Sequence, residues 1–383
     1  MRAFVLGLAL LSACEPGDLD VRRSGDISDV PDVYAADVWG PYEVGFITLE
    51  WVDARGKTLV ADVWYPATHG EDDVPSPYDP TILSGSAVRG AAPDRAGAPY
   101  PVVAFSHGSY GIRFQSVFLM EFLASHGYVS ISPDHERNTF LDPDESAFLE
   151  VLVERPGDMQ SSIDHLLSLA ERSSELLSGM VEDGDVVAMG HSFGAFTSLV
   201  LGGGRWSSEA VAPWCAKHPE ASLPCQYLAG VSDDLIANVP SIDPRVQVTV
   251  AMAPGIWYGF GDDGEGLADV TRPLLFGSRQ DDVLPYEREV VPTFERLSGE
   301  RGLVSFDRAK HYAPYSNLCE FLPAFSDACV GAPEWVDPME AQTVTQTLTL
   351  AWIREALTPG AHDGDLEVFE RGWGDGVDVT VDR

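Results

Sequence analysis

A serine flanked by glycines, between a buried strand and a helix, is the feature that most limits what this chain can fold into. Gly190-His191-Ser192-Phe193-Gly194 follows the apolar run 185–189 and directly precedes the helix-favouring run 195–201. On such a sharp strand-to-helix turn the serine backbone is strained, and side chains at the flanking glycines would collide with neighbouring elements. Five-residue patterns recur by chance, and an ordinary glycine turn is the alternative. The surrounding strand and helix favour Ser192 as a nucleophile, with its Oγ above a sheet.

Strand-like and helix-like segments alternate along the rest of the chain. The sequence predicts strands at 102–106, 128–132, 186–189, 246–252, 274–276 and 303–306, and helices at 115–126, 157–180, 195–201, 286–297 and 339–357. Two further runs, 46–52 and 58–64, predict a hairpin around Asp53-Ala54-Arg55-Gly56. This alternation favours an α/β fold with a mostly parallel sheet and helices on both faces. The antiparallel hairpin is expected at one edge.

A base for Ser192 follows by elimination among the nine histidines. Where this serine turn forms a triad, the acid and then the histidine follow the serine along the chain. Only His311 and His362 come late enough. His362 lies in a polar tail beyond the last predicted helix, whereas His311 follows the strand 303–306 in a loop. We therefore predict His311 as the base.

The acid is expected where a strand ends between Ser192 and His311. After the strand 274–276 the chain reads Gly277-Ser278-Arg279-Gln280-Asp281-Asp282-Val283-Leu284-Pro285. Asp281 is our prediction, with its neighbour Asp282 as the alternative. The preceding strand ends in Ala251-Met252-Ala253-Pro254, which offers no carboxylate.

An attacking serine also needs hydrogen-bond donors for the oxyanion that develops on the carbonyl. One predicted donor is the backbone N–H of Phe193, the residue after the nucleophile. The second should come from the loop Phe105-Ser106-His107-Gly108-Ser109-Tyr110-Gly111, where the N–H of Ser109 is our prediction.

An ordered set of motifs resembles bacterial dienelactone-hydrolase-like esterases, which are relatives of the platelet-activating-factor acetylhydrolases and, more distantly, of polyester hydrolases. The matching stretches are Gly40-Pro41-Tyr42-Glu43-Val44-Gly45, Val63-Trp64-Tyr65-Pro66-Ala67, Ser106-His107-Gly108, Leu123-Ala124-Ser125-His126-Gly127-Tyr128, Pro133-Asp134-His135, Gly190-His191-Ser192-Phe193-Gly194 and Lys310-His311-Tyr312. The resemblance implies an α/β-hydrolase fold, ester hydrolysis through an acyl-enzyme without metal or organic cofactor, and Ser192, Asp281 and His311 as triad.

Two departures from the resemblance narrow the expected substrate. The acetylhydrolases carry their acid after the preceding strand, at the place of 251–254 here, so phospholipid specificity does not transfer directly. Authentic dienelactone hydrolases use a cysteine nucleophile, and this chain has Ser192. The expected substrate is a small-molecule or lipid ester. A phospholipase A2-like hydrolase of short-chain phospholipids and a non-catalytic binding protein on a hydrolase scaffold remain alternatives.

Aromatic residues suggest where an acyl group could bind. Trp257, Tyr258 and Phe260 follow the strand 246–252, and Tyr110 lies beside the predicted oxyanion loop. Core packing explains such aromatics equally well. The long connection 202–245 is expected to form a small cap beside the active site, with surface decoration as the alternative.

The N-terminus has the pattern of an export signal. Arg2 precedes a short apolar stretch that ends in Leu11-Ser12-Ala13-Cys14, which resembles a bacterial lipobox. We therefore expect residues 1–14 to form a lipoprotein signal peptide with lipidation at Cys14, 15–39 an acidic flexible tether, and 40–383 the catalytic domain. The protein would be exported to a bacterial cell envelope and held there by its lipid anchor alone. An ordinary signal peptide is the alternative.

Cysteine and charge patterns agree with export. Besides Cys14, the cysteines form two local pairs, Cys215 with Cys225 and Cys319 with Cys329, although four cysteines permit three pairings and could also stay reduced. With 60 acidic and 24 basic residues, the net charge of −36 argues against nucleic acid as a partner. The acidity favours solubility, or alternatively a binding surface. Weak calcium binding by the acidic tail 362–383 is a further possibility, and oligomeric state is not predicted.

Overall fold

The computed structural model describes the chain from residue 35 onward, with gaps. The described residues are 35–79, 83–207, 209–219, 225–226, 228, 230, 232–236, 242–261, 263–317, 336–362, 364–365, 367–374 and 376–383. The predicted signal peptide with Cys14, the tether up to residue 34, and both Cys319 and Cys329 lie outside these residues.

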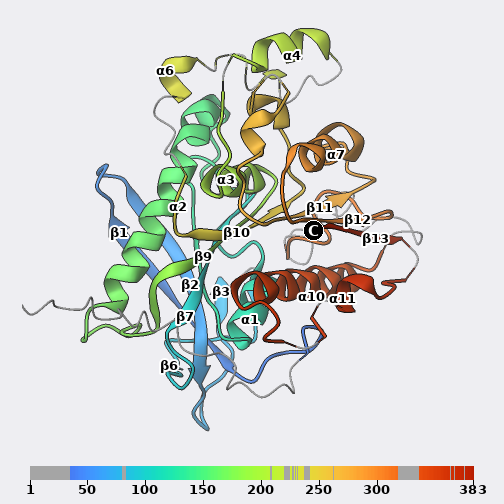
Figure 1. The fold of residues 1–383 in the computed structure, drawn as a ribbon. Helices are drawn as coiled ribbons and strands as arrows, with labels where there is room; N and C mark the ends of the chain where they lie inside the picture. Colours follow the sequence, from blue (N-terminus) through green and yellow to red (C-terminus); the bar gives the residue numbers. More distant parts are fainter. Residues whose placement is uncertain are drawn as a thin grey trace, which may run out of the picture.

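A mixed sheet of 11 strands runs through the molecule (Figure 1). In spatial order its strands are β13 (Val377–Asp382), β12 (Arg301–Phe306), β11 (Pro273–Ser278), β10 (Val246–Met252), β9 (Val181–His191), β7 (Tyr100–Ser106), β8 (Val129–Pro133), β2 (Thr58–Thr68), β1 (Glu43–Val52) and β5 (Val88–Arg89), and β6 (Ala92–Pro93) pairs with β2. The strands from β12 to β8 are parallel, whereas β2 joins β8 and β13 joins β12 antiparallel. A separate ribbon pairs β3 (Pro77–Asp79) with β4 (Leu83–Ser84).

Helices cover both faces of the sheet, as the alternation of strands and helices predicts. The described helices are α1 (Val117–Ser125), α2 (Phe148–Ala170), α3 (Phe193–Leu201), α4 (Val211–Lys217), α6 (Asp233–Ile236), α7 (Tyr286–Arg296), α10 (Pro338–Leu357) and α11 (Glu367–Glu370), with 3-10 turns at η2 (Glu145–Ala147), η3 (Trp257–Gly259) and η4 (Glu265–Leu267). Side chains alternate along the strands, so Val103 and Phe105 pack with α1 and α10, and Val102 and Ala104 pack with α2. Within the described ranges, no helix is long and apolar enough to span a bilayer.

The front hairpin forms where its sequence predicts, but it is not the outermost element of the sheet. β1 pairs with β2 from Glu43↔Ala67 to Val52↔Thr58. The two-residue strand β5 adds to its outer side. The long helix also differs, because α2 begins nine positions before the predicted residue 157 and continues through Pro156.

The chain enters the domain earlier than the expected boundary at residue 40. Ala36 is buried, Val38 O accepts a hydrogen bond from His126 Nε2 at 2.8 Å, and the Trp39 ring meets Phe122 edge-on at 5.8 Å. These contacts tie residues 35–39 to the end of α1, so the end of the expected tether belongs to the packed domain.

The described residues of the connection 202–245 include two short helices, α4 and α6. These helices lie at the top of Figure 1, beyond α2 and α3. A disulfide joins Cys215 of α4 to Cys225, as the local pairing predicts. The Trp214 ring stacks on Tyr258 at 3.6 Å, and Gly230 lies against Leu149 in the first turn of α2. The segment therefore packs on the loop after β10 and on the start of α2.

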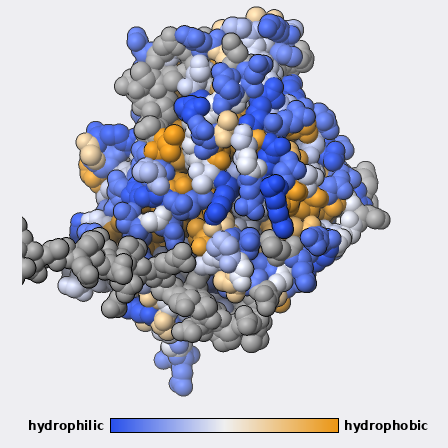
Figure 2. Space-filling model, in the orientation of Figure 1, coloured by the Kyte–Doolittle hydropathy of each residue, from blue (hydrophilic) through white to orange (hydrophobic). Residues whose placement is uncertain are grey.

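The surface agrees with the acidic composition. Figure 2 shows hydrophilic residues over most of one face, with apolar groups gathered in small separate areas. Net charge of this size keeps proteins apart in solution and repels anions.

Candidate active site

The turn between β9 and α3 has the strained geometry that its sequence predicts. Ser192 has φ 57° and ψ −115°, the left-handed side of the map that non-glycine residues rarely adopt. Its N–H donates to Met252 O of β10 at 2.8 Å. A Cβ on Gly190 would come within 2.2 Å of Gly194 O, and one on Gly194 within 1.8 Å of Ser106 O. Both flanking glycines are therefore required by close backbone approach.

The structure brings Ser192, His311 and Asp281 into one hydrogen-bonded chain. Ser192 Oγ lies 2.9 Å from His311 Nε2, and His311 Nδ1 lies 2.6 Å from Asp281 Oδ2. His311 and Asp281 are buried, and Ser192 is partly exposed. This is the geometry in which the imidazole accepts a proton from the hydroxyl while the carboxylate fixes its tautomer.

The carboxylate next to the imidazole belongs to Asp281 and not to the alternative Asp282. The second oxygen of Asp281 accepts the backbone N–H groups of Val283 and Leu284 at 2.8 and 2.9 Å. Asp282 is exposed and pairs with Lys310 at 3.4 Å. The loop after β11 therefore holds Asp281 rigidly against the histidine.

The two predicted oxyanion donors lie on neighbouring elements at the carboxyl ends of β7 and β9. Phe193 N–H opens α3, and the Ser192 side chain caps none of the first-turn N–H groups. Among the described residues, neither Phe193 N–H nor Ser109 N–H donates to a protein acceptor. Ser109 is partly exposed beside the partly exposed Tyr110, whose φ is 55°. Both N–H groups are thus available for a ligand.

A glutamine and the histidine of the elbow form a support that the sequence analysis missed. Gly108 N–H donates to Gln115 Oε1 at 3.0 Å, and Gln115 Nε2 donates to His191 Nδ1 at 3.1 Å. His191 Nε2 in turn donates to His311 O at 2.8 Å. Burial lowers the pKa of His191 well below its ordinary value, so it stays neutral with the proton on Nε2. The one signal for this support in the sequence was the histidine, His191, directly before Ser192.

A second serine–histidine–aspartate chain lies buried behind the first. Ser106 Oγ donates to His135 Nε2 at 2.9 Å, and His135 Nδ1 donates to Asp158 Oδ2 at 2.9 Å. Burial lowers the pKa of His135 well below its ordinary value, and all three side chains are inaccessible. Asp158 also pairs with Arg55 and Lys57 of the front hairpin. Inaccessibility makes this chain a structural support for the end of β7.

The aromatic residues after β10 are mostly part of the core. Tyr258 and Phe260 are fully buried, and Tyr258 lies under Trp214. Trp257 is nearly buried and donates from its indole N–H to Arg288 O at 2.8 Å, with the Arg296 guanidinium 3.8 Å above its ring. Core packing, the alternative to substrate stacking, therefore accounts for Tyr258 and Phe260.

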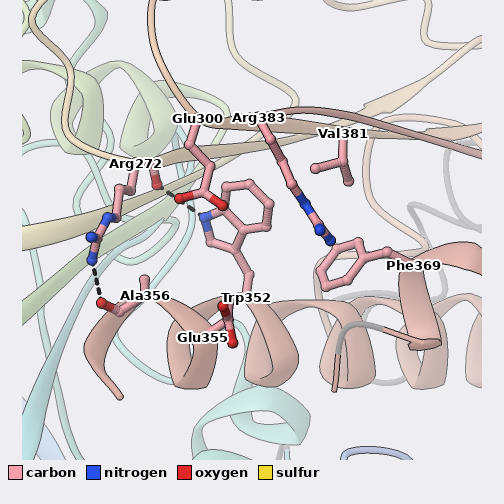
Figure 3. Close-up of a pocket in the computed structure, with 8 residues that line it drawn as sticks. All are labelled: Arg272, Glu300, Trp352, Glu355, Ala356, Phe369, Val381 and Arg383. Carbon is pink, nitrogen blue, oxygen red and sulfur yellow. Dashed lines mark hydrogen bonds between the residues drawn. The ribbon is translucent and has the colours of Figure 1, made fainter. Parts of the chain in front are cut away.

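A small pocket away from Ser192 contains none of the predicted site residues. It lies between the end of α10, α11 and the strand edge at β12 and β13 (Figure 3), and its lining comprises Arg272, Glu300, Trp352, Glu355, Ala356, Phe369, Val381 and Arg383. Hydrogen bonds inside it join Trp352 Nε1 to Arg272 O and the Arg272 guanidinium to Ala356 O.

The described residues contain no group of three or more His, Cys, Asp or Glu that could hold a metal ion. The part of the acidic tail that the structure describes therefore offers no calcium ligand set, and its residues 377–382 form β13 instead.

Comparison with known proteins identifies the fold. No family model matches the chain, and no curated protein matches it. Among solved structures, a ferulic acid esterase from Streptomyces cinnamoneus superimposes with a TM-score of 0.60 at 18% identity, covering 92% of this chain and 98% of that chain. The similarity and the sheet order give this protein the α/β-hydrolase fold.

Proposed function

We propose that this protein of the α/β-hydrolase fold is a serine hydrolase of carboxylic esters. The observation that carries the proposal is the hydrogen-bonded chain from Ser192 Oγ through the imidazole of His311 to Asp281, with distances of 2.9 and 2.6 Å. Ser192 lies on a strained turn that the neighbouring backbone holds in place. Strain of this kind costs about 1–3 kcal/mol and persists mainly at functional sites.

The proton transfers follow from this arrangement. Ser192 Oγ attacks the carbonyl carbon while His311 Nε2 takes its proton, and the imidazolium then gives that proton to the leaving alcohol. An acyl-enzyme on Ser192 remains. Water, deprotonated by His311, then attacks the acyl carbon, and the imidazolium gives this proton to Ser192 Oγ as the acid is released. Asp281 accepts the Nδ1–H bond throughout, which fixes the tautomer and stabilises the imidazolium.

The negative charge on the attacked oxygen is met by backbone donors. Phe193 N–H and Ser109 N–H are the proposed pair, and Phe193 N–H opens a helix whose dipole favours negative charge. Removing one such donor typically costs about 10²–10³ in kcat.

The proposed substrate is a small or medium ester. The similarity to a ferulic acid esterase places aromatic esters on the test panel, and the resemblance to acetylhydrolases adds short-chain phospholipids. The segment 202–245 is the proposed cap, because its residue Gly230 lies against Leu149, whose neighbour Phe148 stacks on Phe193 at 4.9 Å.

Export and lipidation at Cys14 complete the proposal, and the N-terminal pattern of Arg2, a short apolar stretch and Leu11-Ser12-Ala13-Cys14 supports it. Gly40 N–H and Tyr42 N–H both bind Ser125 at the end of α1, just before β8 begins. This is the amino end of the parallel strands, and Ser192 follows the carboxyl end of β9. The chain therefore enters the domain at the end of the parallel strands opposite Ser192.

An ester panel on the full chain tests the activity. The wild type should hydrolyse p-nitrophenyl esters of two to eight carbons or methyl hydroxycinnamates, and Ser192→Ala should lose on the order of 10⁶ in kcat. Ser198→Ala, which removes a buried hydroxyl from the same helix, is the matched control and should stay active. A wild type active only on short-chain phospholipids would favour the acetylhydrolase alternative. One inactive on every ester would favour the binding-protein alternative.

A further inference from the structure

Arg155 of α2 is a fully buried arginine that none of the steps above uses. Within the described residues no carboxylate lies within ion-pair distance of it, and its guanidinium donates instead to backbone and amide oxygens. Burial lowers its pKa to about 9, and the nearby Asp158 opposes that change, so the group stays charged at neutral pH. A buried charge without a carboxylate partner is costly and is seldom kept without a role.

The guanidinium donates hydrogen bonds to the loop that carries one proposed oxyanion donor. Nη1 donates to His107 O at 2.6 Å and Ser106 Oγ at 3.2 Å, and Nη2 donates to Gly108 O at 3.2 Å and Asn138 Oδ1 at 2.7 Å. The Gly108 oxygen also accepts His107 Nδ1–H at 2.7 Å and Gly111 N–H at 3.0 Å. Three donors therefore hold this one carbonyl.

The held carbonyl determines where the Ser109 N–H points. Gly108 C=O and Ser109 N–H belong to the same planar trans peptide unit, so they point in opposite directions. Donors gathered on the oxygen fix the plane and polarise the N–H at its other end. Asn138 also holds this loop in place. Its side-chain Nδ2 donates to Ser109 Oγ at 3.3 Å, and its backbone carbonyl accepts Tyr110 N–H at 3.1 Å.

The same guanidinium lies against the residue that supplies the other donor. Its Cζ is 4.3 Å from the centroid of the Phe193 ring, which also stacks on the Phe148 ring at 4.9 Å. A cation over an aromatic face is stabilised by the ring quadrupole, more so when it is desolvated. One buried side chain thus contacts Phe193 and the Gly108 carbonyl, which belongs to the same peptide unit as the Ser109 N–H.

We propose that Arg155 is a positioning residue that sets the oxyanion hole, by holding the Gly108–Ser109 peptide and the Phe193 ring in fixed relation. The proposal rests on the proposed ester hydrolysis. Lysine cannot replace Arg155, because an ammonium lacks the planar fork needed to reach four oxygens at once. Asp158 would not be orphaned by the change, since it keeps Arg55, Lys57 and His135.

The test compares an ester with its thionoester, in which sulfur replaces the carbonyl oxygen. Sulfur is a weak hydrogen-bond acceptor, so an intact oxyanion hole favours the ester. In full-length Arg155→Lys and Arg155→Met, kcat for the ester should fall about 10–100-fold, and the ester-to-thionoester ratio of kcat/KM should fall about tenfold. Loss of folded protein would lower both rates equally and leave the ratio unchanged.

Two further variants make the result decisive. Arg245→Lys, a half-buried arginine that binds Asp243 and Asp164 at the start of β10, should keep the wild-type ratio. Asn138→Ala, the milder variant if Arg155 variants do not fold, should lower the ratio in the same direction.

An unchanged ratio in the folded variants overturns the role of Arg155 and leaves the ester hydrolysis intact. A wild type that hydrolyses no ester and resists fluorophosphonate labelling overturns the proposed function itself, so the two failures are distinguishable.

Discussion

Ser192 keeps its left-handed backbone because neighbouring strands leave it no other position. Its N–H is bound to Met252 O, and the glycines on both sides allow the end of β7 and the start of α3 to approach within contact. The strain and the close approach are two results of one packing arrangement. Substitutions that relieve or increase the crowding around this turn should therefore change the geometry of the proposed nucleophile.

Gly194→Ala adds to the crowding directly. Its Cβ would lie 1.8 Å from Ser106 O, a backbone atom that cannot rotate away. Overpacking of this kind costs about 1–3 kcal/mol, and a shift of about 1 Å in a catalytic group costs about 10² in rate. We expect a lower Tm and at least a 10²-fold loss of kcat/KM. Gly372→Ala, where a Cβ meets nothing within 4 Å, should change neither quantity. Wild-type rates in Gly194→Ala would contradict this account of the elbow.

Gln115→Met tests the support behind the histidine. The variant leaves the buried Gly108 N–H without its acceptor and releases His191 from its donor. An unsatisfied buried donor costs about 1–3 kcal/mol, so Tm should fall, and kcat should fall about tenfold as His311 loosens. The control is Gln346→Met on α10, which removes an amide hydrogen bond to Phe118 O of α1. Equal losses of kcat in the two variants would show that Gln115 has no special role.

At residue scale, the sequence was informative where chain order limits the choice. Asp281 and His311 were predicted because acid and base must follow successive strands after Ser192. Gln115, His191 and Arg155 were missed because their partners are remote in the chain. Gln115 meets His191 across 76 positions, and Arg155 meets Gly108 across 47. No local pattern announces such contacts, since buried glutamine and arginine look like ordinary helix residues in sequence.

At the scale of elements, the periodicity of apolar residues predicted the central strands. It failed at the start of α2 and at β13, where packing against the rest of the fold decides the structure. The helix was predicted to begin at residue 157, yet α2 runs through Pro156 and Gly157 because Met159, Ile163 and Leu166 bury one face against the sheet. β13 was missed although Val377, Val379 and Val381 alternate with polar residues. The sequence analysis interpreted residues 362–383 as an acidic tail. Propensity is a weak prior that packing overrides.

The link between α10 and α11 predicts a pH dependence of stability. Burial raises the pKa of Asp365 from 3.8 to about 6, and Arg354 only partly opposes the rise. Between these values the folded state binds more protons than the unfolded state, so this group destabilises the fold as pH rises from about 4 to about 7. Asp365→Asn removes the titration. Its Tm relative to the wild type should therefore increase from pH 4 to pH 7.

Thermal unfolding at matched ionic strength measures this difference. Asp164→Asn, which changes a largely exposed carboxylate, is the control and should show a smaller pH-dependent difference. A Tm difference for Asp365→Asn that stays constant or decreases with pH would contradict the raised pKa.

At the scale of the whole molecule, the acidic surface should disfavour anionic substrates. The net charge of −36 repels anions approaching the site, and salt screens this repulsion over a Debye length of about 10 Å at 0.1 M. We expect kcat/KM for an anionic ester to rise several-fold between 20 and 300 mM salt. A neutral ester with the same leaving group should change little. Equal responses of the two esters would show that the acidic surface does not reach the site.

The central claim is that Ser192 is the nucleophile and that His311 activates it. The most direct measurement is site-mapped labelling of the full chain by a fluorophosphonate, with labelled peptides identified by mass. The account predicts one adduct per chain, on the peptide containing Ser192, absent in Ser192→Ala and formed far more slowly in His311→Ala. An adduct on another residue, or labelling that survives in Ser192→Ala, would contradict it.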